Sequence, residues 1–108
     1  MPTYNKLIRD RIPEIIEKSG KRYRIEMLDT PTYEKELQVK LKEELEELIQ
    51  AETTKERVEE MADLLEVVYA LAHLDGVDPS EIERVREGKQ QERGGFEERI
   101  FLLDVEDK

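Results

Sequence analysis

The chain of 108 residues contains no cysteine and only one histidine, His73. The absence of cysteine excludes disulfides, thiolate metal sites and cysteine nucleophiles. A single histidine does not provide the Glu-x-x-His pairs of di-iron carboxylate bundles, and it does not complete the zinc hydrolase motifs. We therefore expect His73 to be an ordinary helix residue and not a metal ligand.

The sequence also lacks a hydrophobic run near the ~20 residues of a membrane span, and its N-terminus has no signal-peptide core. We expect a cytoplasmic protein with no membrane partner. Acids outnumber bases by 28 to 18, for a formal net charge of −10. This balance argues against binding of a nucleic-acid polymer, which depends on lysine and arginine. A smaller polyanionic ligand would need a metal ion or a local group of cations.

Although 43% of the residues are charged, apolar residues recur at helical spacing, which predicts a folded, all-α protein. Residues 1–108 are expected to form one helical domain. The leucine-rich segment from Thr30 to about Ala51 and the apolar segment 54–74 are joined by a short connection, which predicts an antiparallel hairpin. The second of these segments is expected to be a buried central helix.

Shorter elements are predicted on both sides of the hairpin. A short helix follows Asp10, and another runs from Pro79, after its cap Asp78, to about Glu92. Residues 21–29 alternate between apolar and polar, and residues 99–105 have β-prone side chains, so the two segments are expected to form a short two-stranded element.

Four carboxylates lie at or inside the apolar faces of the hairpin. Glu44 flanks the leucine stripe, with Glu47 three residues later, and Glu60 and Asp63 repeat this spacing within the apolar arc of the second helix. Burying an ionised carboxylate is costly unless a cation or strong donors replace the water, and no lysine or arginine lies within one turn on that face. Two such pairs on antiparallel helices can converge on Mg²⁺, with Mn²⁺ as the alternative. The alternative is that these four carboxylates are ordinary solvated acids on a Glu-rich surface.

The motifs LKEELEELIQA and VEEMADLLEVVYAL resemble the EExxE and ExxD motifs of the all-α NTP pyrophosphatase superfamily, which includes MazG-like proteins and phosphoribosyl-ATP pyrophosphohydrolases. The opening YNKLIRDRIPEII and the later GKQQERGGFEERIFLL resemble a subgroup of short MazG-like proteins that are often labelled phosphoribosyl-ATP pyrophosphohydrolase-like. This resemblance implies an antiparallel helical bundle in which Glu44, Glu47, Glu60 and Asp63 bind Mg²⁺.

The resemblance also implies that Lys89 and Arg93 contact phosphates; without it they are ordinary surface cations. The opening motif suggests that an arm containing Lys6 and Arg9, with Asn5 and Asp10, closes over the site of the same or a neighbouring subunit. An arm docked only for stability is the alternative. Gly94 and Gly95 either permit close approach of a ligand or end a helix.

The resulting hypothesis is a Mg²⁺-dependent nucleoside triphosphate pyrophosphohydrolase that acts on a canonical or non-canonical nucleotide. A water attacks a phosphorus, and pyrophosphate leaves. Glu43 or Glu47 accepts the proton of that water, and Glu43 can do so only if the helix rotates or a partner covers its face. The alternatives are a phosphoribosyl-ATP pyrophosphohydrolase and a non-catalytic helical dimerisation module. A homodimer or homotetramer is expected, because one hairpin cannot cover its own apolar arc.

Overall fold

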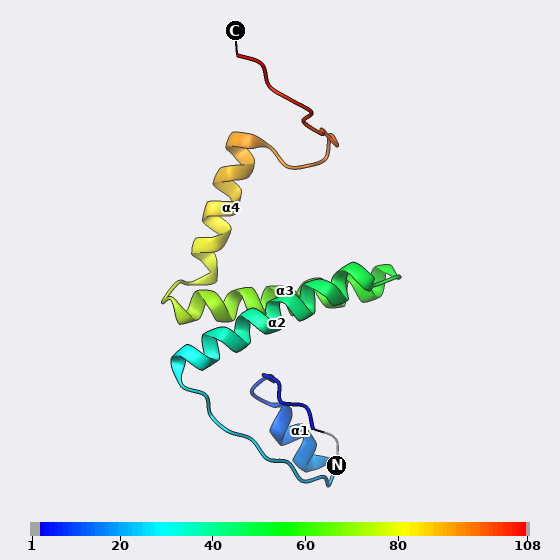
Figure 1. Ribbon diagram of the computed structural model, residues 1–108, viewed down its shortest axis with the longest axis vertical. Helices are drawn as coiled ribbons and strands as arrows, with labels where there is room; N and C mark the ends of the chain where they lie inside the picture. The colour runs from blue at the N-terminus through cyan, green and yellow to red at the C-terminus, as the bar shows by residue number, and fades with distance from the viewer. Residues whose placement is uncertain (1–2, 108) are drawn as a thin grey trace.

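Two long antiparallel helices form the centre of the protein (Figure 1). The computed structural model describes residues 3–107, and within this range it contains four α helices and no strand. This confirms the all-α class and the helical hairpin. None of the described helices combines the length and hydropathy needed to cross a membrane. The helices are α1 (Ile12–Lys18), α2 (Thr30–Gln50), α3 (Thr54–Leu74) and α4 (Pro79–Arg93).

The ends of the helices follow local sequence signals. The side chains of Asp29, Thr53 and Asp78 each accept a hydrogen bond from a backbone N–H in the first turn of the helix that follows, which satisfies a donor that has no partner inside the helix. Gly76, with φ of 71°, reverses the chain after α3, in the left-handed conformation that glycine adopts without strain. The predicted bounds of the hairpin helices are confirmed. The short helix expected after Asp10 is α1, whose N-cap position is Arg11 and which has no side-chain cap.

The predicted two-stranded β element does not form. Residues 21–29 are an extended connection between α1 and α2, and residues 99–105 lie at the opposite end of the molecule (Figure 1). A β-strand needs a neighbouring strand to satisfy its backbone groups, and the two segments are too far apart to pair.

The leucine stripe of α2 is only partly covered by α3. Leu37 is buried, and Leu41 and Leu48 are half-buried against the hairpin. In contrast, Leu45 is 47% exposed and Ile49 is 68% exposed. The stripe is wider than the contact with one neighbouring helix, so its outer edge faces away from α3.

Helix α3 is not the enclosed helix that its composition predicts. Val67 and Ala72 are buried, but Met61, Leu65 and Tyr69 are exposed. The reason is geometric, because α2 covers one side of α3 and α4 contacts it without covering the rest. The apolar arc of α3 therefore remains open in a single chain.

The shape of the chain leaves an unusually large surface. Its accessible area is 10498 Å², whereas a compact folded protein of 12.8 kDa has about 6,300 Å². Its radius of gyration is 18.8 Å, against about 13 Å for a compact domain of this length. Most of the apolar surface that would normally form a core is therefore not covered within one chain.

Candidate functional site

Three of the four predicted metal ligands meet between the two helices of the hairpin. Glu44 and Glu47 lie one turn apart on α2, and Glu60 faces them from α3. One carboxylate oxygen of each residue lies within 4.8 Å of the others. The i, i+3 spacing on α2 and the short connection to α3 produce this arrangement, because they fix which turns of the antiparallel helices face one another.

Glu44 is the most deeply buried charged residue in the described part of the chain, with 6% of its surface exposed. Its Oε1 lies 3.6 Å from Nζ of Lys40, beyond ordinary hydrogen-bond length, and its inaccessible Oε2 has no hydrogen-bond partner among residues 3–107. Burial raises the pKa of Glu44 above its usual value, and the adjacent carboxylate of Glu47 raises it further. This site therefore disfavours an ionised carboxylate that has no added positive charge.

Glu60 presents a second inaccessible oxygen. Its Oε2 also has no hydrogen-bond partner within the described residues. Burial raises the pKa of Glu60, the neighbouring carboxylate of Glu47 opposes this effect, and the charges of Asp63 and Glu44 add to it. Buried polar atoms normally have partners, and an exception often marks an ion.

The carboxylate oxygens of Glu44, Glu47 and Glu60 are suitable ligands for a divalent cation. Mg²⁺ and Mn²⁺ prefer carboxylate oxygens, and the two oxygens without partners, on Glu44 and Glu60, belong to the same cluster of three carboxylates. A bound cation would supply the positive charge that burial and mutual repulsion make necessary. The acidic cluster of Glu44, Glu47 and Glu60 can therefore hold a metal ion.

Asp63, the fourth predicted ligand, has a different partner. Its Oδ1 accepts a hydrogen bond of 2.7 Å from Nη2 of Arg9, and this ion pair is substantially exposed. The charge of Asp63 still acts on both Glu44 and Glu60, so Asp63 lies beside the cluster. Asp63 thus has a cationic side chain as its partner, which the N-terminal arm brings from 54 residues away.

Glu43 lies outside the acidic cluster. Its carboxylate is 3.5 Å from Nζ of Lys40, and the residue is half-exposed. Lys40, which contacts both Glu43 and Glu44, was not among the residues predicted from the sequence. Its spacing of three and four residues from these acids is the pattern of a helical ion pair, so the sequence does contain a signal for it.

Among the described residues, no hydrogen bond or ion pair joins Asn5, Lys6 or Asp10 to Glu44, Glu47 or Glu60. Lys6 stacks over the ring of Tyr4, with its Nζ 5.5 Å from the ring centroid. Asn5 has a left-handed φ of 44°, and Asp10 is exposed. Of the polar residues predicted in this arm, Arg9 contacts a predicted ligand.

The predicted phosphate-binding residues on α4 are not brought to the acidic cluster. Lys89 and Arg93 are exposed on α4, which contacts α3 but not α2 within the described chain and points away from the hairpin (Figure 1). Gly94 ends α4 with φ of 83°, so its structural role is the termination of this helix. His73 is exposed and lies outside the acidic cluster, as expected.

A family model described as phosphoribosyl-ATP pyrophosphohydrolase matches residues 1–87. The match includes the arm, the hairpin and the acidic cluster, and it ends within α4 before Lys89. No significant match is found among curated proteins or among solved structures.

Proposed function

The chain belongs to the phosphoribosyl-ATP pyrophosphohydrolase family, within the MazG-like all-α NTP pyrophosphatase superfamily, and is a pyrophosphohydrolase acting on a phosphoric anhydride; from this premise we propose that it releases pyrophosphate from a nucleoside triphosphate in a Mg²⁺-dependent reaction. The observation that carries the proposal is the pair of buried carboxylate oxygens without partners, on Glu44 and Glu60. These oxygens lie where the helical pattern predicts a metal site.

Glu44, Glu47 and Glu60 are the proposed metal ligands, with Asp63 beside them as the fourth. When bound there, Mg²⁺ or Mn²⁺ would offset phosphate charge and make water more acidic. Glu44 is buried, and Nζ of Lys40 lies 3.6 Å from its Oε1, which leaves Oε2 without a hydrogen-bond partner among the described residues. Exact placement of ligands is the main contribution of a protein to phosphoryl transfer.

In the proposed reaction a water oxygen forms a bond to the α-phosphorus, the α–β anhydride bond breaks, and pyrophosphate leaves. Glu47 is the preferred acceptor of the water proton, because it is exposed at the edge of the acidic cluster. Glu43 is less suited, because it is paired with Lys40 and lies outside the cluster.

The cationic side chains proposed to bind the substrate phosphates lie on the N-terminal arm and on α4. Arg9 already lies beside the acidic cluster, and a guanidinium binds carboxylate and phosphate oxygens with the same geometry. We propose that Arg9, together with Lys6, binds substrate phosphates. Lys89 and Arg93 would contribute from α4 of the same or a neighbouring subunit of a homodimer or homotetramer. Such assembly would also cover the exposed apolar edges of α2 and α3.

Two substrate classes are candidates for this site. The family model favours phosphoribosyl-ATP, whereas the opening motif resembles short MazG-like proteins and favours another nucleotide. In both cases the products include pyrophosphate, so one assay serves both.

The test is pyrophosphate release from a panel of canonical and damaged nucleoside triphosphates and from phosphoribosyl-ATP, with Mg²⁺ and with EDTA. We expect release from at least one class only with the metal. Glu60→Gln should lower kcat by at least roughly 100-fold, since even residues that merely support metal ligands typically contribute 10–100-fold. Glu46→Gln is the matched control, because Glu46 lies outside the acidic cluster and pairs with Gln50. Full activity of Glu60→Gln would place the site elsewhere, and no release from any nucleotide would favour a dimerisation module.

A further inference from the structure

The segment after α4 is apolar and almost fully exposed. We call residues 99–107 the C-terminal tail. One hydrogen bond, from the N–H of Arg99 to the carbonyl oxygen of Phe96, closes the turn before it, and no other backbone–backbone hydrogen bond is formed by the described residues 95–107. Contiguous exposed apolar surface of this kind marks an interaction site. The apolar side chains of the tail, each at least 73% exposed, are Ile100, Phe101, Leu102, Leu103 and Val105.

The backbone directs this tail away from the chain that carries it. Gly94 and Arg99 have left-handed φ values of 83° and 59°, and the tail continues outward beyond the end of α4 (Figure 1). In this structure the apolar side chains of the tail are therefore not covered by its own helices.

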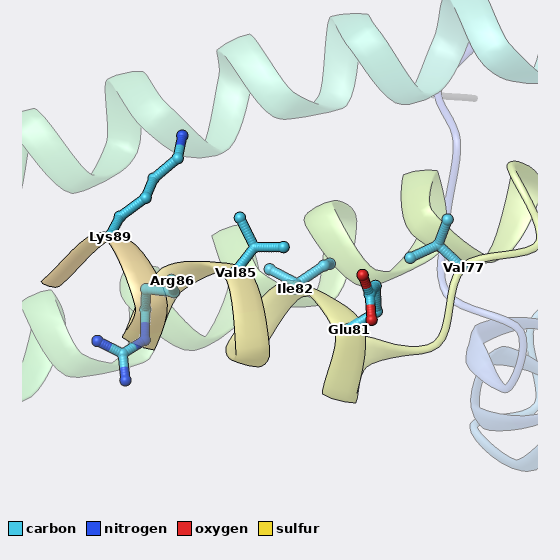
Figure 2. A pocket seen from close by; sticks show the side chains of 6 residues that line it. All are labelled: Val77, Glu81, Ile82, Val85, Arg86 and Lys89. Carbon is cyan, nitrogen blue, oxygen red and sulfur yellow. The ribbon is translucent and has the colours of Figure 1, made fainter. Parts of the chain in front are cut away.

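Helix α4 carries an apolar groove that is also uncovered. Figure 2 shows Val77, Ile82 and Val85 following one another along this groove, with the stem of Lys89 at its end. Its volume is about 470 Å³. Because its lining is largely apolar and it lies away from the acidic cluster, it suits side chains better than a triphosphate.

We propose that the C-terminal tail of one chain docks in the α4 groove of a second copy. The charge of the tail favours docking on α4 over docking on the open face of the hairpin formed by α2 and α3. The tail carries Asp104 and Glu106, and the charged residues that line the groove are Arg86, Lys89 and one acid, Glu81. Arg86 also pairs with Glu83 and Glu87 on the same helix. Helix α4 has four acidic and four basic residues, whereas α2 and α3 together carry an excess of acids that would repel the tail.

The dimensions agree with this pairing. An extended chain from Phe101 to Val105 spans about 13 Å, and α4 from Pro79 to Lys89 extends about 15 Å. Alternation along the tail places Phe101, Leu103 and Val105 on the side that faces the groove and Asp104 and Glu106 on the other side. The two acids therefore favour α4 over the acidic hairpin through its lower negative charge and do not need to pair directly with groove residues. Each copy donates one tail and accepts another, which gives the two-fold symmetry of most dimers. The accessible area in excess of a compact monomer, about 4,000 Å², is ample for a standard interface of about 800 Å² per partner.

The natural absence of cysteine permits a direct test. Val85→Cys, carrying a size tag, and untagged Leu103→Cys are mixed, unfolded and refolded together, and oxidised. We expect a reducible heterodimer band that exceeds the homodimer bands by at least tenfold. Met27→Cys, at an exposed site outside α4 and the tail, replaces Leu103→Cys in the control mixture. Equal cross-linking of the control would overturn the proposal.

A chain carrying both Val85→Cys and Leu103→Cys distinguishes exchange from folding back. Exchange gives a disulfide-linked dimer, whereas a compact oxidised monomer would mean that the tail covers its own α4 and would refute the proposal. Light scattering on Leu103→Asp provides a second measurement. Its dimer dissociation constant should rise at least tenfold, or about 1.4 kcal/mol, whereas Gln38→Asp, which adds the same charge on α2, should leave it unchanged. None of these readouts requires turnover, so their failure and the failure of the proposed reaction are distinguishable.

Discussion

Glu44→Gln should stabilise the metal-free protein and remove its stabilisation by divalent cations. Glutamine has the shape of glutamate, and its amide oxygen can keep the contact with Lys40. Its amide nitrogen can donate to the carboxylate of Glu47 or Glu60, which lie within reach of Glu44. The substitution thus replaces a repelling, buried negative charge by a donor.

The expected gain follows from the orphan oxygen of Glu44. An unsatisfied buried polar atom costs about 1–3 kcal/mol, so the metal-free variant should gain about 1 kcal/mol or more, or about 4–8 °C in Tm per kcal/mol for a domain of this size. Burial raises the folded-state pKa of Glu44 above its ordinary value of 4.5, so the native state binds the proton more readily than the unfolded state. The stability of the wild type therefore falls as pH rises through the folded-state pKa, and the gain should be complete at higher pH and fade toward pH 4.5.

Thermal unfolding at one protein concentration, first in EDTA and then in Mg²⁺ or Mn²⁺, measures both effects. A cation at 100 times its Kd stabilises the wild type by about 2.7 kcal/mol, and this increase should shrink in Glu44→Gln. Glu46→Gln, two residues further along α2, should keep it. A variant that unfolds more easily in EDTA, or that retains the full response to the cation, would refute the metal-site reasoning.

Three further substitutions test separate parts of the structure. Arg9→Ala should raise KM by roughly tenfold, since it removes a phosphate-binding guanidinium, and should hardly change Tm because its ion pair is exposed; an unchanged KM in steady-state kinetics would contradict its role. Thr53→Ala should lower the free energy of unfolding by about 1 kcal/mol, measured in urea, because it removes the side-chain acceptor at the start of α3; no loss would mean that the cap is replaced by water. A hydrogen bond from Thr32 lowers the pKa of Asp29 below its usual 3.8, so the stability from this cap is present above that value and is lost as pH falls through the folded-state pKa. In Asp29→Asn the free energy of unfolding should therefore fall less steeply as the pH is lowered. The same fall in the variant and the wild type would contradict this role of Asp29.

The hairpin could be predicted from sequence because its determinants are local. Thr53 and Gly76 mark the ends of α3 through contacts within a few residues, and the leucine spacing of α2 defines its apolar face. The degree of burial could not be read in the same way. Leu45 and Leu65 belong to apolar faces, but whether such a face is covered depends on helices or subunits that the local pattern does not specify.

The acidic cluster was predictable for the same reason. The short connection between α2 and α3 makes Glu60 face Glu44 and Glu47, and the helical spacing alone places all three between the helices. The pairing of Asp63 with Arg9 depends on the path of residues 10–29, which contains an irregular extended segment with no register. Sequence periodicity does not relate positions 54 residues apart, so the contact between Arg9 and Asp63 could not be predicted from the sequence.

The distribution of charge constrains substrate binding in the proposed reaction. Three carboxylates converge within 4.8 Å, and two unit charges of the same sign at about 5 Å repel by roughly 3 kcal/mol at an effective dielectric constant of 20. A triphosphate approaching the bare acidic cluster would meet this repulsion from several groups, and Lys40 is already shared between Glu43 and Glu44. Arg9 offsets one charge, that of Asp63. A divalent cation held by the acidic cluster would offset this repulsion, so that in the proposed reaction a chain of net charge −10 could bind a polyanion without a basic surface.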